Sequence, residues 1–270
     1  MIDRQSFDYG NGPSDFVLDV LICSRKPMTS PKQAEFETGR RNQFQVADVS
    51  RRLGAALDIV VLCDFDGTIV EIDTAEHILD RFAQGDWRAL DQKLDSGEMS
   101  LEECMRRQFM MVKVRRKVIV DELDGSARVR SGFQELVDHC ESVGIPFTIT
   151  SAGLDFYIKH FLRQRGLEER IGLVVPRVRV TKDGVKFAFP KLVDHSSVSF
   201  KDDIVRLNMK KGKRVVYIGD GTTDFNAARI AHYPFAVRGS KLARLLSSHD
   251  IPHEELTDLR TVIETLRRMK

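Results

Sequence analysis

The stretch DIVVLCDFDGT, residues 58–68, decides the fold of this chain. It opens on a continuous apolar run, Ile59 to Cys63, that is rich in β-branched residues, which predicts a strand buried on both faces. Asp64 and Asp66 follow this run directly. A buried strand that ends in carboxylates is typical of parallel α/β sheets, whose ligands bind beyond the carboxyl ends of the strands.

Helical periodicity follows, without a good strand until about residue 124. Further on, apolar runs alternate with helical patterns to the end of the chain, and turn residues at 182–184 predict a β-hairpin. The predicted helices are 74–82, 86–94, 100–111, 115–123, 132–143, 154–165, 201–209, 223–231, 242–246 and 259–269. The predicted strands after the first are 146–150, 171–175, 214–218 and 235–237, with the hairpin at 178–189.

Strands that alternate with helices predict a mostly parallel sheet covered on both faces. The expected class is therefore α/β, with a doubly wound, Rossmann-like sheet. Its core comprises residues 58–72 and 124–270, and residues 73–123 form a small helical cap inserted after the first strand. Residues 1–57 carry turn residues and one amphipathic pattern at 42–57. They predict a partly helical or disordered extension without chemistry of its own.

Composition excludes several classes of protein. The 270 residues include 42 Lys and Arg against 40 Asp and Glu, a net charge of +2 that argues against a strongly basic nucleic-acid binder. No apolar run is long enough to span a bilayer. The four cysteines are scattered without a CxxC pair, which indicates free thiols. We expect a cytoplasmic monomer or homodimer that binds neither nucleic acid nor membrane.

Three predicted strands end in residues that carry chemistry. The first ends in Asp64 and Asp66, a second in Ser151-Ala152-Gly153, and a third in GDGTTD at 219–224. Four carboxylates at one sheet edge repel one another, so the site should require a cation. Because no His or Cys accompanies these oxygen ligands, the expected cation is Mg²⁺.

A metal held by carboxylates at an open sheet edge suits a phosphate ester. Asp64 can attack phosphorus to form an aspartyl-phosphate. Asp66 can protonate the leaving oxygen and later activate water. Gly67 leaves the backbone free to approach the phosphate, while Ser151 and a lysine can donate to its equatorial oxygens.

These motifs resemble those of the haloacid dehalogenase superfamily of phosphatases, over about residues 58–270. DFDGT (64–68) resembles its first motif, the strand ending at Ser151 its second, and GDGTTD (219–224) its fourth. The third motif of the superfamily is a lysine upstream of the fourth motif. Lys201 resembles this lysine, and Lys191 is the alternative.

The resemblance implies specific roles. Asp64 would be the nucleophile and Asp66 the general acid and base. Mg²⁺ would be held by the Asp64 carboxylate, the Asp66 backbone carbonyl and Asp220, with Asp224 in support. The residues implied to bind the phosphoryl group are Gly67, Thr68, Ser151, Gly153 and Lys201.

The inserted helices resemble the small cap of the phosphoserine phosphatase branch. Within it, DWRAL (86–90), SLEE (100–103) and IPFTITSAGLDFYI (145–158) resemble the 2-hydroxy-3-keto-5-methylthiopentenyl-1-phosphate phosphatases of methionine salvage. The second motif reads SAG where SGG is usual in those enzymes, and their cysteine-rich region is absent. The cap Glu and Arg with which phosphoserine phosphatases hold their amino acid correspond to Asp73 and Gln108, with Arg106 or Arg107 as a substitute cation.

The predicted function is hydrolysis of a small phosphorylated metabolite, a phosphomonoester, with Mg²⁺ and an aspartyl-phosphate. The methionine-salvage enol phosphate is one candidate substrate, and phosphoserine is the alternative. A phosphotransferase or mutase would share these residues and differ only in its product. A catalytically inactive phosphate-binding regulator is a further alternative, against which the intact set of Asp64, Asp66, Ser151, Lys201 and Asp220 argues.

Overall fold

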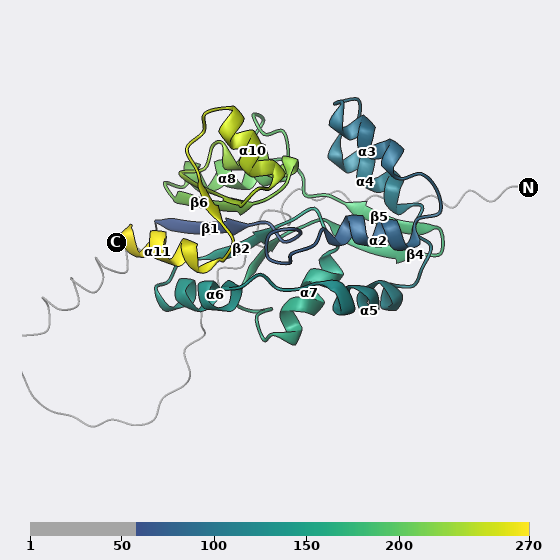
Figure 1. Cartoon of the computed structure of the whole chain (residues 1–270), viewed down its shortest axis with the longest axis horizontal. Helices are drawn as coiled ribbons and strands as arrows, with labels where there is room; N and C mark the ends of the chain where they lie inside the picture. Colours follow the sequence, from purple (N-terminus) through teal and green to yellow (C-terminus); the bar gives the residue numbers. More distant parts are fainter. Residues whose placement is uncertain (1–57, 270) are drawn as a thin grey trace, which may run out of the picture. The chain divides into compact units, whose positions relative to one another are not determined.

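The computed structural model describes residues 58–269, so the helix predicted at 42–57 lies outside the described part. Six parallel strands form one sheet in the order β3-β2-β1-β6-β7-β8. Figure 1 labels three of them, β2, β1 and β6. The strands are β1 (Ile59–Cys63), β2 (Phe147–Thr150), β3 (Gly172–Val174), β6 (Arg214–Gly219), β7 (Tyr233–Val237) and β8 (Glu254–Leu256).

Helices cover both faces of this sheet. Val61 and Cys63 of β1 belong to the apolar cluster that includes α6 (Phe133–Ser142), α7 (Asp155–Gln164) and α11 (Arg260–Arg268). Val60 and Leu62 point to the other face, into a second cluster. That cluster contains residues of α8 (Phe200–Lys210), α9 (Phe225–Ala228) and α10 (Lys241–Ser248). The doubly wound, Rossmann-like α/β class predicted from the sequence is confirmed.

The register of the central strands aligns their carboxyl ends. Cys63 of β1 lies opposite Ile149 of β2 and Ile218 of β6. The amide of Asp64 continues the ladder and donates to the carbonyl of Ile218 at 2.8 Å. The segments that follow β1, β2 and β6 therefore leave the sheet side by side, where the sequence predicts the site.

Four helices are inserted between β1 and β2, as the periodicity predicts. They are α2 (Thr74–Phe82), α3 (Arg88–Asp95), α4 (Leu101–Phe109) and α5 (Arg116–Ser126). Two connecting segments lead into and out of these inserted helices. They run antiparallel and form a single β-bridge between Val70 and Val129. The amide of Glu71 donates to the carbonyl of Arg128 at 2.9 Å, which joins the two connections at the base of the insertion.

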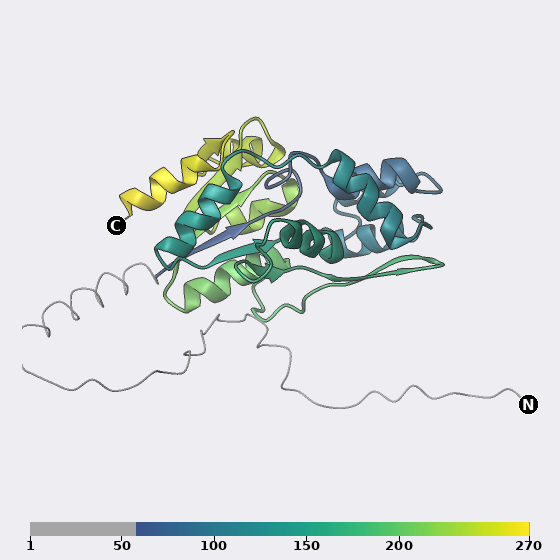
Figure 2. The same cartoon turned by 90° about the horizontal axis from the view of Figure 1, so that it is seen from below.

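The predicted hairpin is formed by β4 (Arg177–Thr181) and β5 (Gly184–Ala188). It packs against the inserted helices, because the ring of Phe187 meets that of Phe109 of α4 edge-on at 5.0 Å between centroids. It is also tied to the sheet layer, where the amide of Val178 donates to Asp155 of α7 at 3.1 Å. The hairpin therefore contacts both the inserted helices and α7. Figure 2 shows it as a long pair of green strands that extends beneath the inserted helices.

Two elements differ from the prediction. The helix expected at 223–231 begins as a 3₁₀ turn, Thr222–Asp224, and α9 ends at Ala228, because the chain must return to the sheet at Tyr233. Strand β8 was not predicted. It is an edge strand that buries only Leu256 and exposes Glu254 and Glu255, so it lacks the apolar pattern by which strands are recognised.

The sequence predicts no membrane-spanning segment and free cysteines, and the structure bears on both for the residues that it describes. Between residues 58 and 269, no helix combines the length and apolarity that a membrane span requires. Cys63, Cys104 and Cys140 are buried there and form no disulfide. Cys23 lies outside the described range.

Candidate active site

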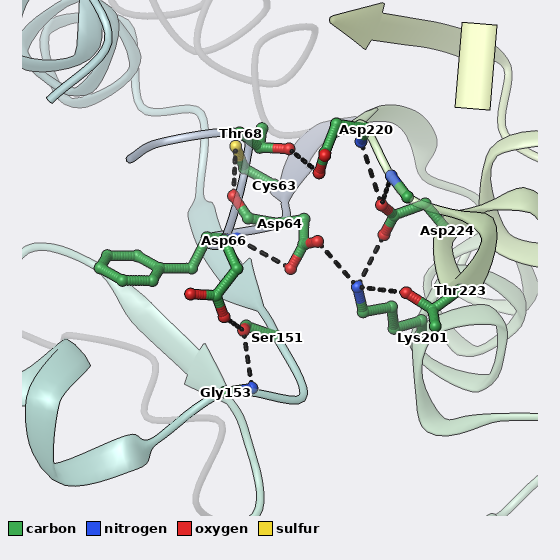
Figure 3. A network of polar contacts seen from close by, with 12 residues as sticks. Cys63, Asp64, Asp66, Thr68, Ser151, Gly153, Lys201, Asp220, Thr223 and Asp224 are labelled. Atoms are coloured by element: carbon green, nitrogen blue, oxygen red, sulfur yellow. Dashed lines mark hydrogen bonds and ion pairs between the residues drawn. The ribbon is translucent and has the colours of Figure 1, made fainter. Parts of the chain in front are cut away.

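The ends of β1, β2 and β6 gather the predicted polar residues into one cluster (Figure 3). One carboxylate oxygen from each of Asp64, Asp220 and Asp224 lies within 4.8 Å of the other two. Ser151, from the end of β2, contacts Asp66 from its Oγ to Oδ2 at 3.2 Å. The cluster therefore combines residues that are more than 80 positions apart in the chain.

Lys201 is the cation of this cluster. Its Nζ lies 2.9 Å from Oδ2 of Asp64 and 2.7 Å from Oδ1 of Asp224, and its side chain is only 3% exposed. It is the second residue of α8, whose start is fixed by a capping box between Ser199 and Asp202. The alternative, Lys191, is exposed in the loop before α8, so the structure brings only Lys201 to the cluster.

Asp224 uses both of its carboxylate oxygens within the protein. Oδ1 accepts from Lys201 and from the hydroxyl of Tyr217, each at 2.7 Å. Oδ2 accepts from the amides of Asp220 and Gly221, at 3.1 and 2.9 Å. Four donors stabilise this carboxylate in its ionised form and fix its position under Lys201.

The charges of the cluster are unevenly stabilised. Burial and the charge of Asp224 raise the pKa of Asp64 well above its ordinary value, although Lys201 opposes them. Burial and Asp224 also raise the pKa of Asp220 to about 7. Burial alone would raise the pKa of Asp224 too, but Lys201 and the hydrogen bonds lower it below its ordinary value. Two carboxylates thus resist ionisation beside a third that is ionised, an arrangement that an added cation relieves.

The donor set at this place fits a hard divalent cation. Asp64, Asp220 and Asp224 offer oxygen ligands only, which Mg²⁺ prefers. Of these three, Asp220 retains the most free capacity, because its one hydrogen bond runs from Thr68 Oγ1 to Oδ1 at 3.0 Å. A cation would compete with four protein donors at Asp224 and with fewer at Asp64 and Asp220.

Asp66 is held apart from the other carboxylates. Both the amide and the hydroxyl of Thr74 donate to its Oδ1, and Ser151 donates to its Oδ2. Burial and the charge of Asp73 raise the pKa of Asp66 to about 6, although the hydrogen bonds from Thr74 lower it. A carboxyl group that titrates near neutral pH is suited to giving and taking a proton.

Two glycines allow the close approaches in the cluster. Gly67 has a φ of +69°, and a Cβ there would overlap the Asp220 carboxylate. A Cβ on Gly153 would overlap the Asp66 carboxylate. The amide of Gly153 donates to Ser151 Oγ at 3.0 Å, which orients that hydroxyl. Both glycines are thus required by space, and Gly67 by its backbone conformation as well.

The order of these residues along the sheet identifies a protein family. The family model for haloacid dehalogenase-like hydrolases matches residues 61–229, which contain Asp64, Ser151, Lys201 and Asp220. The chain belongs to the haloacid dehalogenase-like hydrolase family. The expectation drawn from the sequence motifs is thereby confirmed.

Curated members of this hydrolase family are similar along most of the described chain. A 2-hydroxy-3-keto-5-methylthiopentenyl-1-phosphate phosphatase of Geobacillus thermodenitrificans is 30% identical over 217 residues, covering 78% of this chain and 97% of the relative. The enzyme of the same name from Brevibacillus brevis is 29% identical and covers 78% of this chain and 96% of the relative.

Solved structures share the fold of this chain. A phospho-aspartyl intermediate analogue of phosphoserine phosphatase aligns with a TM-score of 0.58 and 18% identity, over 77% of this chain and 98% of that chain. A hydrolase of Salmonella enterica serovar Typhi aligns with a TM-score of 0.58 and 16% identity, over 74% of this chain and 67% of that chain.

Three residues of this hydrolase were expected to contact the substrate, and each already interacts with another residue of the protein. Asp73 caps α2 by accepting from the amide of Glu76. Gln108 is buried and donates to the carbonyl of Trp87 at 3.3 Å and to Asp91 at 3.1 Å. Arg107 is exposed and pairs with Glu103. Asp73 acts on the cluster through its charge, which raises the pKa of Asp66 and of Asp220.

Three residues of the site were missed by sequence reasoning. Thr74 holds Asp66, and Tyr217 holds Asp224. Arg130 donates from Nε to the carbonyl of Thr68 at 2.7 Å and from Nη2 to that of Gly67 at 2.8 Å, so it fixes the loop after Asp66. Of these three, Tyr217 was detectable from the sequence, because it places a hydroxyl inside an apolar run two residues before the fourth motif.

Proposed function

We propose that this haloacid dehalogenase-like hydrolase is a Mg²⁺-dependent phosphomonoester hydrolase that acts on a small phosphorylated metabolite through an aspartyl-phosphate. The observation that carries the proposal is the buried contact between Lys201 and Asp64 at the end of β1, beside an Asp66 that is held separately. This geometry fixes the position of one aspartate and keeps the other separate from it, as a nucleophile and an acid-base group require.

Asp64 is the proposed nucleophile. One of its carboxylate oxygens forms a bond to phosphorus while the bond from phosphorus to the leaving oxygen breaks. Lys201 keeps the carboxylate in place and, with Ser151, donates to the equatorial phosphoryl oxygens, whose charge grows in the transition state. We propose that Gly67, Thr68 and Gly153 also belong to the phosphate site, where their amides now donate to Ile72, Phe65 and Ser151 Oγ.

Asp66 is the proposed general acid and base. Its protonated carboxyl gives a proton to the leaving oxygen in the first step. The resulting carboxylate takes a proton from water in the second step, as the water oxygen bonds to phosphorus and the bond to Asp64 breaks. Phosphate then leaves, and both aspartates return to their starting state.

Mg²⁺ is the proposed metal. Asp64, the backbone carbonyl of Asp66 and Asp220 would hold it, with Asp224 in support. When bound, the ion neutralises the carboxylates and the phosphoryl oxygens so that two anions can meet. The raised pKa values of Asp64 and Asp220 support this proposal, because burial and the charge of Asp224 make their ionised forms unfavourable and a cation would stabilise them.

We propose 2-hydroxy-3-keto-5-methylthiopentenyl-1-phosphate as the first substrate to test, because the relatives that carry its name cover most of the chain. Phosphoserine fits less well. Its carboxylate needs a free cation in the cap, whereas Arg107 pairs with Glu103 and Arg106 with Glu102. A glutamine at 108, whose amide is engaged inside the insertion, does not replace that cation.

The chain divides into a catalytic part and a part that selects the substrate. We propose that residues 58–72 and 124–270 act as the catalytic core, and that residues 73–123 act as a cap that selects the substrate. The β4–β5 hairpin links the two, because it contacts α4 of the cap and α7 of the core. A cytoplasmic monomer or homodimer is expected.

Removal of divalent metal should abolish phosphate release. We expect EDTA to lower turnover by about 1,000-fold, since metal stabilisation of phosphoryl charge is worth several kcal/mol, and added Mg²⁺ to restore it. The measurement is phosphate release from a panel that contains the enol phosphate, phosphoserine, sugar phosphates and pyridoxal phosphate. Unchanged turnover in EDTA would contradict the metal assignment, and phosphoryl transfer to an acceptor without free phosphate would indicate a transferase.

A further inference from the structure

The carboxylate of Asp66 is held asymmetrically by the first residue of the inserted helices. Thr74 donates to Oδ1 twice, through its amide at 3.1 Å and through its hydroxyl. Oδ2 receives a single hydrogen bond, from Ser151 at 3.2 Å, and lies next to Gly153 (Figure 3). The two oxygens of the proposed acid and base are therefore not equivalent.

The hydroxyl of Thr74 is not needed to begin the helix. Asp73 is the N-cap of α2, and its side chain accepts from Glu76 at 2.9 Å. Thr74 is the first helical residue, and its side chain is completely buried against Asp66 instead of pointing to solvent. A threonine whose hydroxyl makes no capping bond, yet is fully buried on a carboxylate, has a purpose beyond helix capping.

The two hydrogen bonds that Oδ1 of Asp66 accepts from Thr74 favour Oδ2 as the oxygen that carries the acidic proton. Oδ1 already accepts two hydrogen bonds, so a proton bound to it would displace one of these donors. Oδ2 faces the side of Ser151 and Gly153, where the phosphoryl group is proposed to bind. A proton on Oδ2 therefore points toward the leaving oxygen without loss of a bond from Thr74.

We propose that Thr74 is a positioning residue that selects Oδ2 of Asp66 as the oxygen that exchanges the proton with the leaving group. The inference rests on the proposed function. In the first step the proton passes from Oδ2 to the leaving oxygen as the bond from that oxygen to phosphorus breaks and the bond from Asp64 forms. In the second step Oδ2 takes a proton from the attacking water. Because Thr74 belongs to α2, the inserted helices thereby take part in the chemistry.

The test compares leaving groups of different basicity. A good leaving group departs without help from an acid, whereas a poor one requires the proton. Aryl phosphates whose phenols have pKa values from about 7 to about 10 sample this range. Release of the phenol in a single turnover, with enzyme in excess over substrate, reports the first step alone.

Thr74→Val keeps the amide and the shape but removes the hydroxyl. We expect it to slow phenol release about 30-fold for the poorest leaving group and less than about 3-fold for the best, since one positioned acid contributes about 100-fold or more. KM should change little, and Thr74→Ser should restore the rates. The matched control is Thr265→Val, which removes another buried hydroxyl, on α11.

Equal slowing for all leaving groups, or no slowing at all, would overturn the proposal. If Thr74→Val does not fold by circular dichroism, Thr74→Ala takes its place in the same comparison. Failure of the proposed function would look different. The wild-type protein would then release no phenol from any aryl phosphate, whichever residue stands at 74.

Discussion

Asp64→Asn should eliminate phosphate release from every substrate that the wild-type protein accepts, by at least about 1,000-fold. The amide of asparagine has nearly the same shape as the carboxylate but cannot form an acyl phosphate. Asp64 is 5% exposed and contacts Lys201, whereas Asp224, the other carboxylate on Lys201, is engaged by four donors within the protein. Lys201 would retain its ion pair with Asp224 in the variant. The fold should therefore remain intact while the chemistry stops.

Asp194→Asn is the matched control for this substitution. Asp194 is also a buried carboxylate with a lysine partner, Lys210, at 2.8 Å, but it lies in the loop before α8. We expect kcat within about 3-fold of the wild-type value for this control, because a substitution away from the reacting atoms leaves the transition state unchanged. Residual turnover above about a tenth in Asp64→Asn would show that another group attacks phosphorus.

Lys201→Met should weaken both catalysis and folding. The buried ammonium lies between Asp64 and Asp224, and its loss leaves two buried carboxylates without their cation. Removing one partner of a buried ion pair costs about 3–5 kcal/mol of folding free energy. We expect a loss of that size in urea unfolding without metal, and a loss of turnover of about 1,000-fold, because the phosphoryl group also loses its donor.

Lys191→Met separates this effect from a general need for positive charge. Lys191 is exposed in the loop before α8, so its substitution should change neither the free energy of unfolding nor turnover. Lys201→Arg should not rescue turnover, because a planar guanidinium does not fit the space of a compact ammonium between two carboxylates. Full activity in Lys201→Met, together with a loss in Lys191→Met, would show that the lysines have been assigned in the wrong order.

The fold could be predicted because its signals are local. The run Ile59 to Cys63 specifies a buried strand by composition alone, and helical patterns separate most of the following apolar runs, except before the hairpin at 178–189. The strand β8 could not be predicted, because an edge strand with two exposed glutamates needs no apolar pattern.

The site was predictable where strand ends deliver the residues, and less so where side chains reach across the fold. Thr68 and Arg130 are 62 residues apart, and no spacing rule links them. The same holds for Thr74, because its hydroxyl finds Asp66 only once the inserted helices are in place. The positions chosen in the insertion, Arg107 and Gln108, lie on an amphipathic helix whose orientation is set by packing, which periodicity alone does not reveal.

The central claim is that phosphorus becomes bonded to Asp64. The most direct measurement is rapid mixing of the Mg²⁺-loaded protein with substrate, acid quenching, and mass spectrometry of the peptide that contains residues 58–68. We predict the mass of one phosphoryl group on Asp64 in the wild-type protein, convertible to homoserine by borohydride, and none in Asp64→Asn. A phosphoryl group on any other residue, or none while phosphate is released at the normal rate, would contradict the account.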